Sequence, residues 1–424
     1  MPQEAHAAIN AVWRMESPRL IAGLTRIVRD IGLAEDLAHD ALVAALQQWP
    51  EAGVPENPAA WLMAAAKHRA VDHFRRNTLR ERKHQEIARQ LDVKEKTVPD
   101  FDAALDTTIE DDLLRLIFIA CHPVLSKEAR VALTLRLLGG LSTTEIARAF
   151  LVSEPTIAQR VVRAKRTLAQ KHVPFEVPHG PDLAERMASA LEVIYLIFNE
   201  GYSATAGDDW MRPALCEEAL RLGRILAGLV SQEAEVHGLV ALMELQASRS
   251  HARVAPSGEP ILLLKQNRAR WDQLLIRRGL ESLERALSLG GSPGSYVLQA
   301  EIAACHARAR TPEETDWNRI AMHYASLFQL TRSPVVELNR AVAVGMANGP
   351  AAGLEIVDAL ISEPALKNYH LLPSVRGDLL EKLGRFEEAY VEFESAASQT
   401  RNARERDLAL QRADSLRALL RSEV

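Results

Sequence analysis

The stretch GLSTTEIARAFLVSEPTIAQRVVRAKRTLA, residues 140–169, predicts two short helices separated by a tight turn. Ser142, followed three residues later by a glutamate, has the pattern of a capping box at the start of the first helix. Ser153 is a second N-cap, and Pro155 stands in the first turn of the next helix, where a missing N–H costs little. Residues 151–153 have the right length for the turn of a helix-turn-helix.

The second helix of this pair has an apolar side and a cationic side. Its apolar stripe consists of Ile157, Val161, Ala164 and Leu168. The opposite side carries Gln159, Arg163 and Arg166, with Arg160 on its flank. No acidic residue occurs in residues 155–171. Because caps, turn, stripe and charge agree, the pattern favours a helix that enters a nucleic-acid groove over a solvated basic helix.

Length and composition indicate a chain of several helical domains. The chain has 424 residues, more than one ordinary hydrophobic core supports, so two or three domains are expected. Apolar residues make up 47% of the sequence and aromatic residues 5%, and alternating β-branched runs are nearly absent, which favours an all-α fold. With no secretory signal and no apolar run long enough to span a bilayer, we expect a soluble, cytoplasmic protein without a membrane partner.

The cysteines predict neither a disulfide framework nor a metal site. The three of them, Cys121, Cys216 and Cys305, stand far apart, with no C-x-x-C pattern and no Cys/His pairing. We therefore expect no metal and no cofactor.

The net charge of −5 is distributed unevenly. The first 172 residues carry 24 lysines and arginines against 22 acidic residues, and their positive charge is concentrated in residues 67–89 and 155–171. A protein that binds duplex DNA alone usually relies on many phosphate contacts. Two small basic clusters are thin support for such binding, which points to a partner that supplies the remaining contacts.

Residues 18–90 form one predicted helical block with a proline-containing loop at residues 50–58. Before the loop, residues 34–50 have apolar positions at helical spacing and exposed acids. After it, the segment NPAAWLMAAAKHRAVDHFRR, residues 57–76, opens a helix at Asn57 and has a packed side and a basic side.

An acidic segment, residues 92–112, follows this block and carries eight acids against two lysines. Its composition predicts a disordered or extended linker. The helix-turn-helix block then covers residues 113–173, and the prolines of HVPFEVPHGPD, residues 172–182, mark the main domain boundary. Residues 183–424 read as pairs of helices to the end.

The last helical pair has the residue spacing of a tetratricopeptide repeat, in which small side chains let two antiparallel helices pack closely. Its signature residues are Gly377, Gly384, Ala389, Phe393 and Ala396. The final three of these have counterparts 37 residues upstream in Ala352, Ile356 and Ala359, and looser ones in Gly279, Leu283 and Ala286. We expect a short, degenerate array of helical repeats.

Three motifs in this order resemble one family. They are EDLAHDALVAALQQW at residues 35–49, AAWLMAAAKHRAVDHFRR at residues 59–76, and the helix-turn-helix. Residues 18–172 thereby resemble a bacterial RNA polymerase sigma factor of the extracytoplasmic-function (ECF, sigma-70 family) type. The remainder, opening with LIFNEGYSA at residues 196–204, resembles the C-terminal extension of a subgroup in which tetratricopeptide-like repeats follow the sigma core. The resemblance implies sigma region 2 in residues 1–91, the acidic linker, sigma region 4 in the helix-turn-helix block, and the extension.

The resemblance also implies the role of three surfaces. Core RNA polymerase would be bound by Asp36, Leu37, Asp40 and Gln47. The downstream promoter element would be faced by Trp61, Lys67, Arg69, His73, Arg75 and Arg76. The major groove of the upstream element would receive the side chains of Thr156, Gln159, Arg160, Arg163 and Arg166, with Lys165 on phosphates. Trp61 fits two interpretations equally: a platform for an extruded base, or a core tryptophan.

Two functions from different classes fit the pattern. The first is an alternative sigma factor that binds core polymerase and directs it to specific promoters, with C-terminal repeats that regulate or support it through a protein partner or an intramolecular contact. The second is a stand-alone helix-turn-helix regulator with a sensing repeat domain. The basic block at residues 61–76 favours the first, because a simple regulator does not need it.

The string NEGY, residues 199–202, raises a catalytic hypothesis with Glu200 as base and Tyr202 as acid. No nucleophile, metal cluster or phosphate loop accompanies it, so we expect no enzymatic activity. Gly201 is explained as a helix C-cap. With Tyr195 and Phe198 nearby in an aromatic-poor chain, we expect this segment to form an interface between the sigma core and the repeats.

Overall fold

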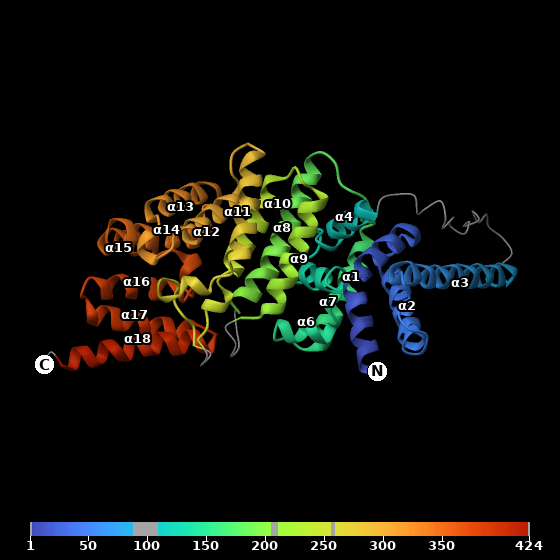
Figure 1. Ribbon diagram of the computed structural model, residues 1–424, viewed down its shortest axis with the longest axis horizontal. Coiled ribbons are helices and arrows are strands. Elements are labelled where there is room, and N and C mark those ends of the chain that lie inside the picture. Colours follow the sequence, from blue (N-terminus) through green and yellow to red (C-terminus); the bar gives the residue numbers. More distant parts are fainter. Residues whose placement is uncertain (1, 88–108, 205–210, 256–258, 423–424) are drawn as a thin grey trace. The chain divides into compact units, whose positions relative to one another are not determined.

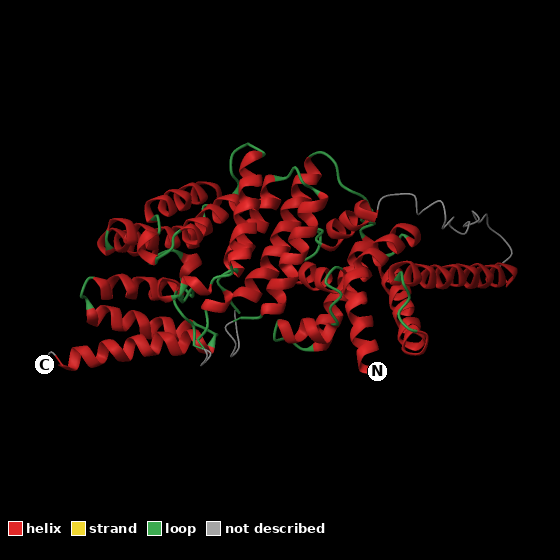
Figure 2. Ribbon diagram, viewed as in Figure 1, coloured by secondary structure: helices red, strands yellow, loops and turns green. Residues whose placement is uncertain are grey.

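The computed structural model describes residues 2–87, 109–204, 211–255 and 259–422, and this part of the chain is built from helices (Figure 2). It contains no strand, only an isolated bridge between Val254 and Pro260. The predicted all-α fold is therefore confirmed. No helix of the described ranges combines the length and the apolar character needed to cross a bilayer.

The chain divides into two compact units, residues 1–194 and 195–424. The first unit holds the helices shown from blue to green in Figure 1. They are α1 (Pro2–Val28), α2 (Ile31–Ala52), α3 (Pro58–Ile87), α4 (Ile109–Ala120), α5 (Lys127–Leu137), α6 (Thr143–Ala149), α7 (Glu154–Gln170) and the first part of α8 (Pro181–Tyr202).

One core connects the helices on either side of residues 88–108. Helix α1 packs against α2 and α3, and it also contacts α4 and α5. Leu24 of α1, Leu62 of α3 and Leu116 of α4 are each at most 1% exposed. Full burial of one such leucine contributes about 2 kcal/mol to stability. Helix α1 therefore packs against helices from both sides of residues 88–108.

Two element boundaries differ from the sequence expectation. Helix α2 continues through Pro50 to Ala52, because a proline in the last turn removes a single intrahelical hydrogen bond, and the helix ends at Gly53 with a φ of 84°. Helix α4 begins at Ile109, inside the segment expected to be linker. Residues 92–108 of the predicted linker lie outside the described residues, and its last residues, 109–112, belong to α4.

Among its described residues, the second unit contains the end of α8, ten further α-helices and five 3-10 helices of three residues each. The ten α-helices are α9 (Pro213–Leu229), α10 (Ala234–Ala247), α11 (Gln273–Ser288), α12 (Ser295–Arg308), α13 (Trp317–Thr331), α14 (Pro334–Asn348), α15 (Pro350–Leu360), α16 (Leu371–Lys382), α17 (Phe386–Gln399) and α18 (Ala403–Ser422). Helix α10 packs on α11 and α12, and from α13 onward each helix packs on the next (Figure 1).

The last helical pair is built as the sequence predicts. A side-chain carbon added at Gly377 would come within 3.0 Å of the Phe393 ring, so the glycine allows α16 and α17 to approach. Gly384 forms the turn between them with a φ of 74°. Ala389 and Ala396 are buried on the same side of α17 as Phe393.

The upstream counterpart was predicted in the wrong register. Ala359 is exposed, and Ala352 and Ile356 are half-buried. The buried residues of α15 are Gly353, Leu354 and Val357, so Gly353 and Val357 stand 36 residues before Ala389 and Phe393. The three looser counterparts, Gly279, Leu283 and Ala286, are all buried. Alanine is small enough to occupy either side of a helix, which is why the sequence left the register ambiguous.

Gly201 does not cap α8, because the helix continues to Tyr202. A side-chain carbon at Gly201 would lie 2.6 Å from the backbone nitrogen of Cys216 at the start of α9. The glycine is therefore needed for the close approach of two helices rather than for a turn. Glu200 forms an ion pair with Arg212, which gives it a structural partner.

Candidate nucleic-acid interface

Helix α7 is fixed at its start by a cap. The Ser153 hydroxyl accepts a hydrogen bond from the Thr156 backbone N–H at 3.4 Å, and Pro155 occupies the first turn. The Thr156 hydroxyl lies 2.7 Å from the Ser153 hydroxyl. The predicted N-cap is confirmed, and Thr156 is half-buried and engaged in the cap at the end where a groove-binding helix begins.

The apolar stripe of α7 holds the helix against its neighbours. Ile157, Val161, Ala164 and Leu168 are all buried, as predicted. Helix α7 packs against α5 and α6 along this side. Because successive side chains on a helix point in directions fixed about 100° apart, burial of the stripe also determines which residues face outward on the opposite side.

An exposed cationic ridge runs along the opposite side of α7. We define it by Gln159, Arg163 and Arg166, which are exposed, with Arg160 half-buried beside them. Neither Arg163 nor Arg166 forms an ion pair or side-chain hydrogen bond with a described residue. Their guanidinium groups therefore remain available for an external acceptor such as a base edge or a phosphate.

The preceding helix α6 is braced at its first residue. Ser142 and Glu145 form the predicted capping box, with the Ser142 backbone N–H donating to the Glu145 carboxylate at 2.8 Å. The second carboxylate oxygen of Glu145 accepts from Arg14 of α1 at 2.7 Å. The same glutamate thus caps α6 and ties it to the first helix of the chain.

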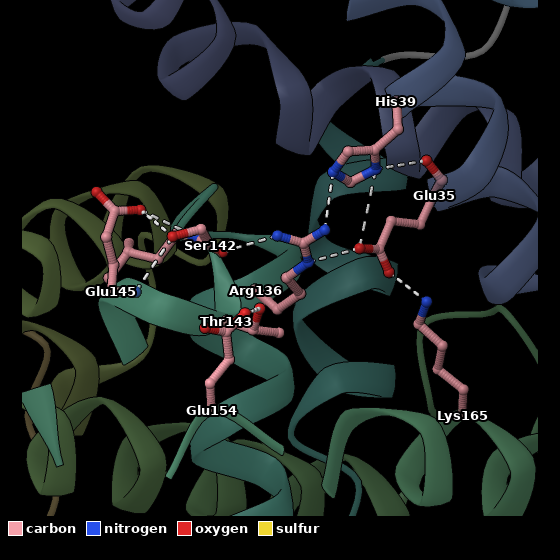
Figure 3. Close-up of polar contacts among 9 residues, drawn as sticks. Glu35, His39, Arg136, Ser142, Thr143, Glu145, Glu154 and Lys165 are labelled. Atoms are coloured by element: carbon pink, nitrogen blue, oxygen red, sulfur yellow. Dashed lines mark hydrogen bonds and ion pairs between the residues drawn. The ribbon is translucent and has the colours of Figure 1, made fainter. Parts of the chain in front are cut away.

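Lys165, predicted to contact phosphates, is engaged within the protein in this structure. Although it stands on α7, its ammonium group forms an ion pair with Glu35 of α2 (Figure 3). The Glu35 side chain is only 5% exposed, and its other oxygen accepts a hydrogen bond from Arg136 of α5 at 2.6 Å. The Glu35 carboxylate is therefore shared by a cation of α7 and a cation of α5.

The two cations decide the ionisation of Glu35. Burial alone would raise the pKa of its carboxyl group, but Lys165 and Arg136 outweigh burial, and the net pKa is lowered. Glu35 is therefore charged at neutral pH. Removing either partner would leave a buried charge with less compensation, which is the costly case for a buried ion pair.

Arg136 and His39 complete this cluster (Figure 3). The His39 Nδ1 lies 2.9 Å from the Glu35 backbone carbonyl, and its Nε2 lies 2.8 Å from an Arg136 guanidinium nitrogen. Since arginine can only donate, Nε2 must accept and Nδ1 must carry the proton, so the geometry requires a neutral imidazole. Arg136 also donates to the Leu141 carbonyl at 3.2 Å, directly before the capping box of α6.

A second buried carboxylate lies at the start of α4. Asp112 is 3% exposed and accepts from Arg115 at 2.7 Å, and its other oxygen lies 2.9 Å from Arg26 of α1. Burial, the largest effect, raises the pKa of Asp112 despite these cations. This residue was expected in the linker, but its two arginine partners hold it in the core.

The basic side of α3 is exposed but partly engaged by acids and carbonyls. Arg69 lies 3.6 Å from Asp40 of α2, and the Arg76 Nε donates to the Asp72 carbonyl of its own helix at 3.2 Å. Lys67 is half-buried and Arg75 is exposed. The predicted cations thus gather on one helix, and one of them pairs with a residue assigned to a different surface.

Two aromatic residues of α3 sit in contact with other rings. Trp61 is half-buried and packs edge-on against the buried Trp49, with ring centroids 5.3 Å apart. The half-buried His73 lies with its ring 6.0 Å from Phe74. Asn57 caps the helix through the Ala60 N–H at 3.0 Å, as the sequence predicted. Trp61 is therefore a packed residue that is only half-buried.

Helix α2 presents an acidic outer side. Asp36, Asp40 and Gln47 are exposed, whereas Leu37 is 3% exposed and packs into the core. Leu37 therefore cannot contact a partner on this surface as predicted, and it serves the helix instead. The three polar residues lie on one side because they recur at a spacing close to whole helical turns.

The comparisons with known proteins follow this division of the chain. Residues 12–80 match the model for sigma-70 region 2, residues 115–168 match sigma-70 region 4, and residues 186–287 match a family of unknown function (DUF6596). The probable ECF RNA polymerase sigma factor SigI of Mycobacterium tuberculosis is 27% identical over 172 residues, which cover 41% of this chain and 58% of that protein. The chain belongs to the ECF sigma factors.

Two other relatives match a smaller and a larger part of this ECF sigma factor. The ECF RNA polymerase sigma factor SigK of a Mycobacterium species (strain KMS) is 28% identical over 36% of this chain and 77% of its own length. An uncharacterized protein of Rhizobium meliloti is 42% identical over 92% of this chain and 91% of its own length. The C-terminal extension is therefore shared with a full-length relative. Sigma factors are initiation factors rather than enzymes, and their family implies contact with core polymerase and promoter DNA.

Sequence reasoning missed the polar cluster of this ECF sigma factor around Glu35. A signal was present, because Glu35 stands among the buried positions Ala34, Leu37 and Ala38 of α2. An acid on the apolar side of a helix indicates a buried partner. The identity of that partner could not be read from the sequence, since Arg136 is 101 residues away.

Proposed function

We propose that this chain binds core RNA polymerase through α2 and directs it to promoters with two elements, one contacted by α7 and one by α3. The observation that carries the proposal is the exposed ridge of α7, whose Arg163 and Arg166 lack an intramolecular partner among the described residues. A bidentate contact from each to a base edge would supply about 1–3 kcal/mol of discrimination. Such a function belongs in the cytoplasm, where polymerase works.

The downstream element requires help from the polymerase. Opening DNA costs about 1.4 kcal/mol per stacked step, and capturing one unstacked base on protein returns about 1–3 kcal/mol. The half-buried Trp61 and the cations of α3 can capture a base but cannot hold a bubble alone. Polymerase bound to the exposed Asp36, Asp40 and Gln47 would supply the remainder.

The Glu35 cluster joins α2 to α7, and this connection bears on how the two helices could reach two promoter elements. Lys165 is bound to Glu35 of α2, so α7 and α2 are joined while the cluster is intact. We infer that the two regions separate when the chain spans two promoter elements, and that Lys165 then exchanges the carboxylate for a phosphate. The second unit would regulate or support initiation, through a protein partner or through a contact with the first unit.

Transcription reconstituted with the purified full chain and core polymerase tests this function. We expect specific transcripts from a genomic promoter library only when the chain and the core enzyme are both present. Initiation by the core enzyme alone at the same start sites would contradict the proposal. A DNase footprint produced by the chain without polymerase, together with no stable complex between chain and polymerase, would favour the stand-alone regulator.

A further inference from the structure

The second unit contains an alternation of cationic and aromatic side chains that sigma-factor function does not explain. The Arg253 guanidinium lies 3.6 Å from the centre of the Tyr202 ring, and the Arg249 guanidinium lies 5.8 Å from the same ring. Arg249 is also 5.9 Å from the centre of the Trp271 ring, and Arg268 is 5.1 Å from it. Three guanidinium groups thus alternate with two rings, and Arg249 is the central one.

The outer two arginines are held by the protein. Arg268 donates to the carbonyls of His306 and Ala309 at 3.0 and 2.7 Å, and to the Thr315 hydroxyl at 2.8 Å. Arg253 donates to the Tyr202 carbonyl. These hydrogen-bond acceptors are neutral, and the acids that act on Arg268 are Glu313 and Glu314.

Arg249 differs from both. Its side chain forms no hydrogen bond and no ion pair with a described residue, and its Nε is buried. The residue as a whole is half-buried, which leaves its guanidinium a path to solvent. A guanidinium without a carboxylate, flanked by two further guanidinium groups, is a position where a negative charge would be strongly favoured.

Further buried donors belong to the same cluster. The Trp271 indole N–H, the His306 Nδ1 and the Arg268 Nε are each buried without a hydrogen-bond partner among the described residues. Trp271, His306 and Arg268 are 3%, 7% and 8% exposed. A buried donor without an acceptor lowers stability. Water can satisfy such a donor but brings no charge, whereas an oxyanion would satisfy several donors and neutralise the cluster.

Electrostatics shows that these groups are close together. Burial first, and then Arg249 and Arg268, lower the pKa of His306 to about 3. Burial is also the main cause that lowers the pKa of Arg268, and Arg249 lowers it further, against the raising effects of Glu313 and Glu314. His306 is therefore neutral at pH 7 and can donate through Nδ1 in one tautomer.

We propose that Arg249, Trp271 and His306 form a binding site for the oxyanion of a small molecule, a phosphate or a carboxylate group. Arg249 supplies the charge, and the indole N–H and the imidazole supply directed hydrogen bonds. The site lies between the end of α10 and α12, within the second unit. It does not depend on promoter recognition, because binding is measured on the chain itself.

The experiment measures anion binding to the full chain at pH 7.5 by calorimetry and thermal unfolding. Sodium phosphate and sodium acetate are compared with sodium chloride at equal ionic strength. We expect saturable binding and a higher Tm in one oxyanion arm, phosphate indicating a phosphoryl ligand and acetate a carboxylate ligand. Equal behaviour of all three salts would overturn the proposal.

The variant Arg249→Gln keeps much of the side-chain volume and breaks no hydrogen bond to a described residue, so we expect it to fold. Its oxyanion affinity should fall at least about tenfold. Arg277→Gln is the matched control, since Arg277 is an exposed residue of α11 with no side-chain hydrogen bond or ion pair to a described residue. Undiminished binding by Arg249→Gln, or an equal loss in the control, would overturn the assignment.

A spectroscopic readout keeps the proposal testable if Arg249→Gln does not fold. The indole N–H resonance of Trp271 is assigned in the wild-type chain by its absence in Trp271→Phe. We expect it to move on titration with the bound oxyanion and to saturate at the calorimetric affinity. An indole resonance that stays in place while the anion binds would place the anion elsewhere and reject this site.

Discussion

The two helices proposed to contact DNA, α7 and α3, use their cations differently. On α7 the Arg163 and Arg166 side chains have no hydrogen-bond or ion-pair partner among the described residues, whereas Lys165 is paired with the buried Glu35. On α3 the engaged cations make weak surface contacts, as Arg69 does with Asp40, where both side chains are more than a third exposed. Within the described part of the chain, these cations of α7 are therefore either free or fixed to α2 by a buried pair, whereas the surface cations of α3 are held only by weak, exposed contacts.

This difference separates two kinds of charge in one DNA-binding protein. Buried charge pairs fix the arrangement of elements because breaking them is costly. Exposed pairs contribute about 0–1 kcal/mol and yield readily to a better partner. The comparison can be tested by changing each kind in turn.

The largest effect is expected from the ridge of α7. Replacing Arg163 and Arg166 together with glutamine should reduce promoter-directed transcription at least about 30-fold, because two base or phosphate contacts are lost. The measurement is reconstituted transcription with core polymerase. The paired control is Arg277→Gln with Arg278→Gln, two exposed arginines of α11. Unchanged transcript yield and start sites would show that the ridge does not contact DNA.

The buried cluster should dominate the stability of the first unit. Glu35→Gln leaves Arg136 and Lys165 without their counter-charge, and we expect the free energy of unfolding to fall by about 3 kcal/mol. Denaturant unfolding followed by circular dichroism measures it. Glu51→Gln, an exposed glutamate near the end of the same helix, is the control and should leave stability unchanged. Superimposable curves for Glu35→Gln and wild type would contradict a structural role.

The same cluster predicts a pH dependence. Because Lys165 and Arg136 lower the pKa of Glu35 in the folded state, its contribution is fully present above the ordinary glutamate pKa of 4.5. It is lost as the pH falls through the lowered value. The stability difference between wild type and Glu35→Gln should therefore shrink on acidification below pH 4.5. A difference that stays constant down to pH 3 would rule out an ionised Glu35.

The cap of α7 should have a moderate effect. Ser153→Ala removes the acceptor for the Thr156 N–H, and we expect a loss of about 1 kcal/mol. Thermal unfolding measures the change against Thr144→Ala, which alters an exposed residue of α6. If the two variants melt together, the cap does not hold the start of the recognition helix.

The smallest effect on stability is expected at the surface pair of α3. Asp40→Asn releases Arg69, and we expect the free energy of unfolding to change by less than about 0.5 kcal/mol. Under the proposed function the same change weakens binding to core polymerase, which competition binding detects. Asp72→Asn, on an exposed residue of α3, serves as the control. A large loss of stability would mean that the Asp40–Arg69 pair fixes the structure as the Glu35 cluster does.

Local features of these helices could be predicted from the sequence because their causes are local. The capping box at Ser142, the cap at Ser153 and the stripe through Val161 each depend on residues within one or two turns. The tertiary partner of Lys165 could not be predicted, because a lysine on a basic helix looks the same whether it faces a phosphate or a distant glutamate. Asp112 shows the converse, since an acidic stretch conceals a carboxylate buried by two arginines.

The second unit also contains one feature that the sequence predicts and one that it does not. Spacing found the pair α16 and α17, because Gly377 and Phe393 are needed for close packing. The cluster at Arg249 left no trace in spacing, since its members come from the ends of α8, α10 and α12 and from short turns between helices. Side chains that meet only through the tertiary fold need coordinates to be recognised.

Arg136 connects α2 to the start of the helix-turn-helix, so a separation of α2 from α7 would affect both ends of this connection. Its guanidinium holds Glu35 and His39 of α2 with some nitrogens and the Leu141 carbonyl, next to the α6 cap, with another. If α2 moves away, Arg136 loses its contacts with Glu35 and His39 but keeps its hydrogen bond to the Leu141 carbonyl. The rest of its guanidinium group could then reorient, so separation of α2 would change the surroundings of the residue that precedes the α6 cap.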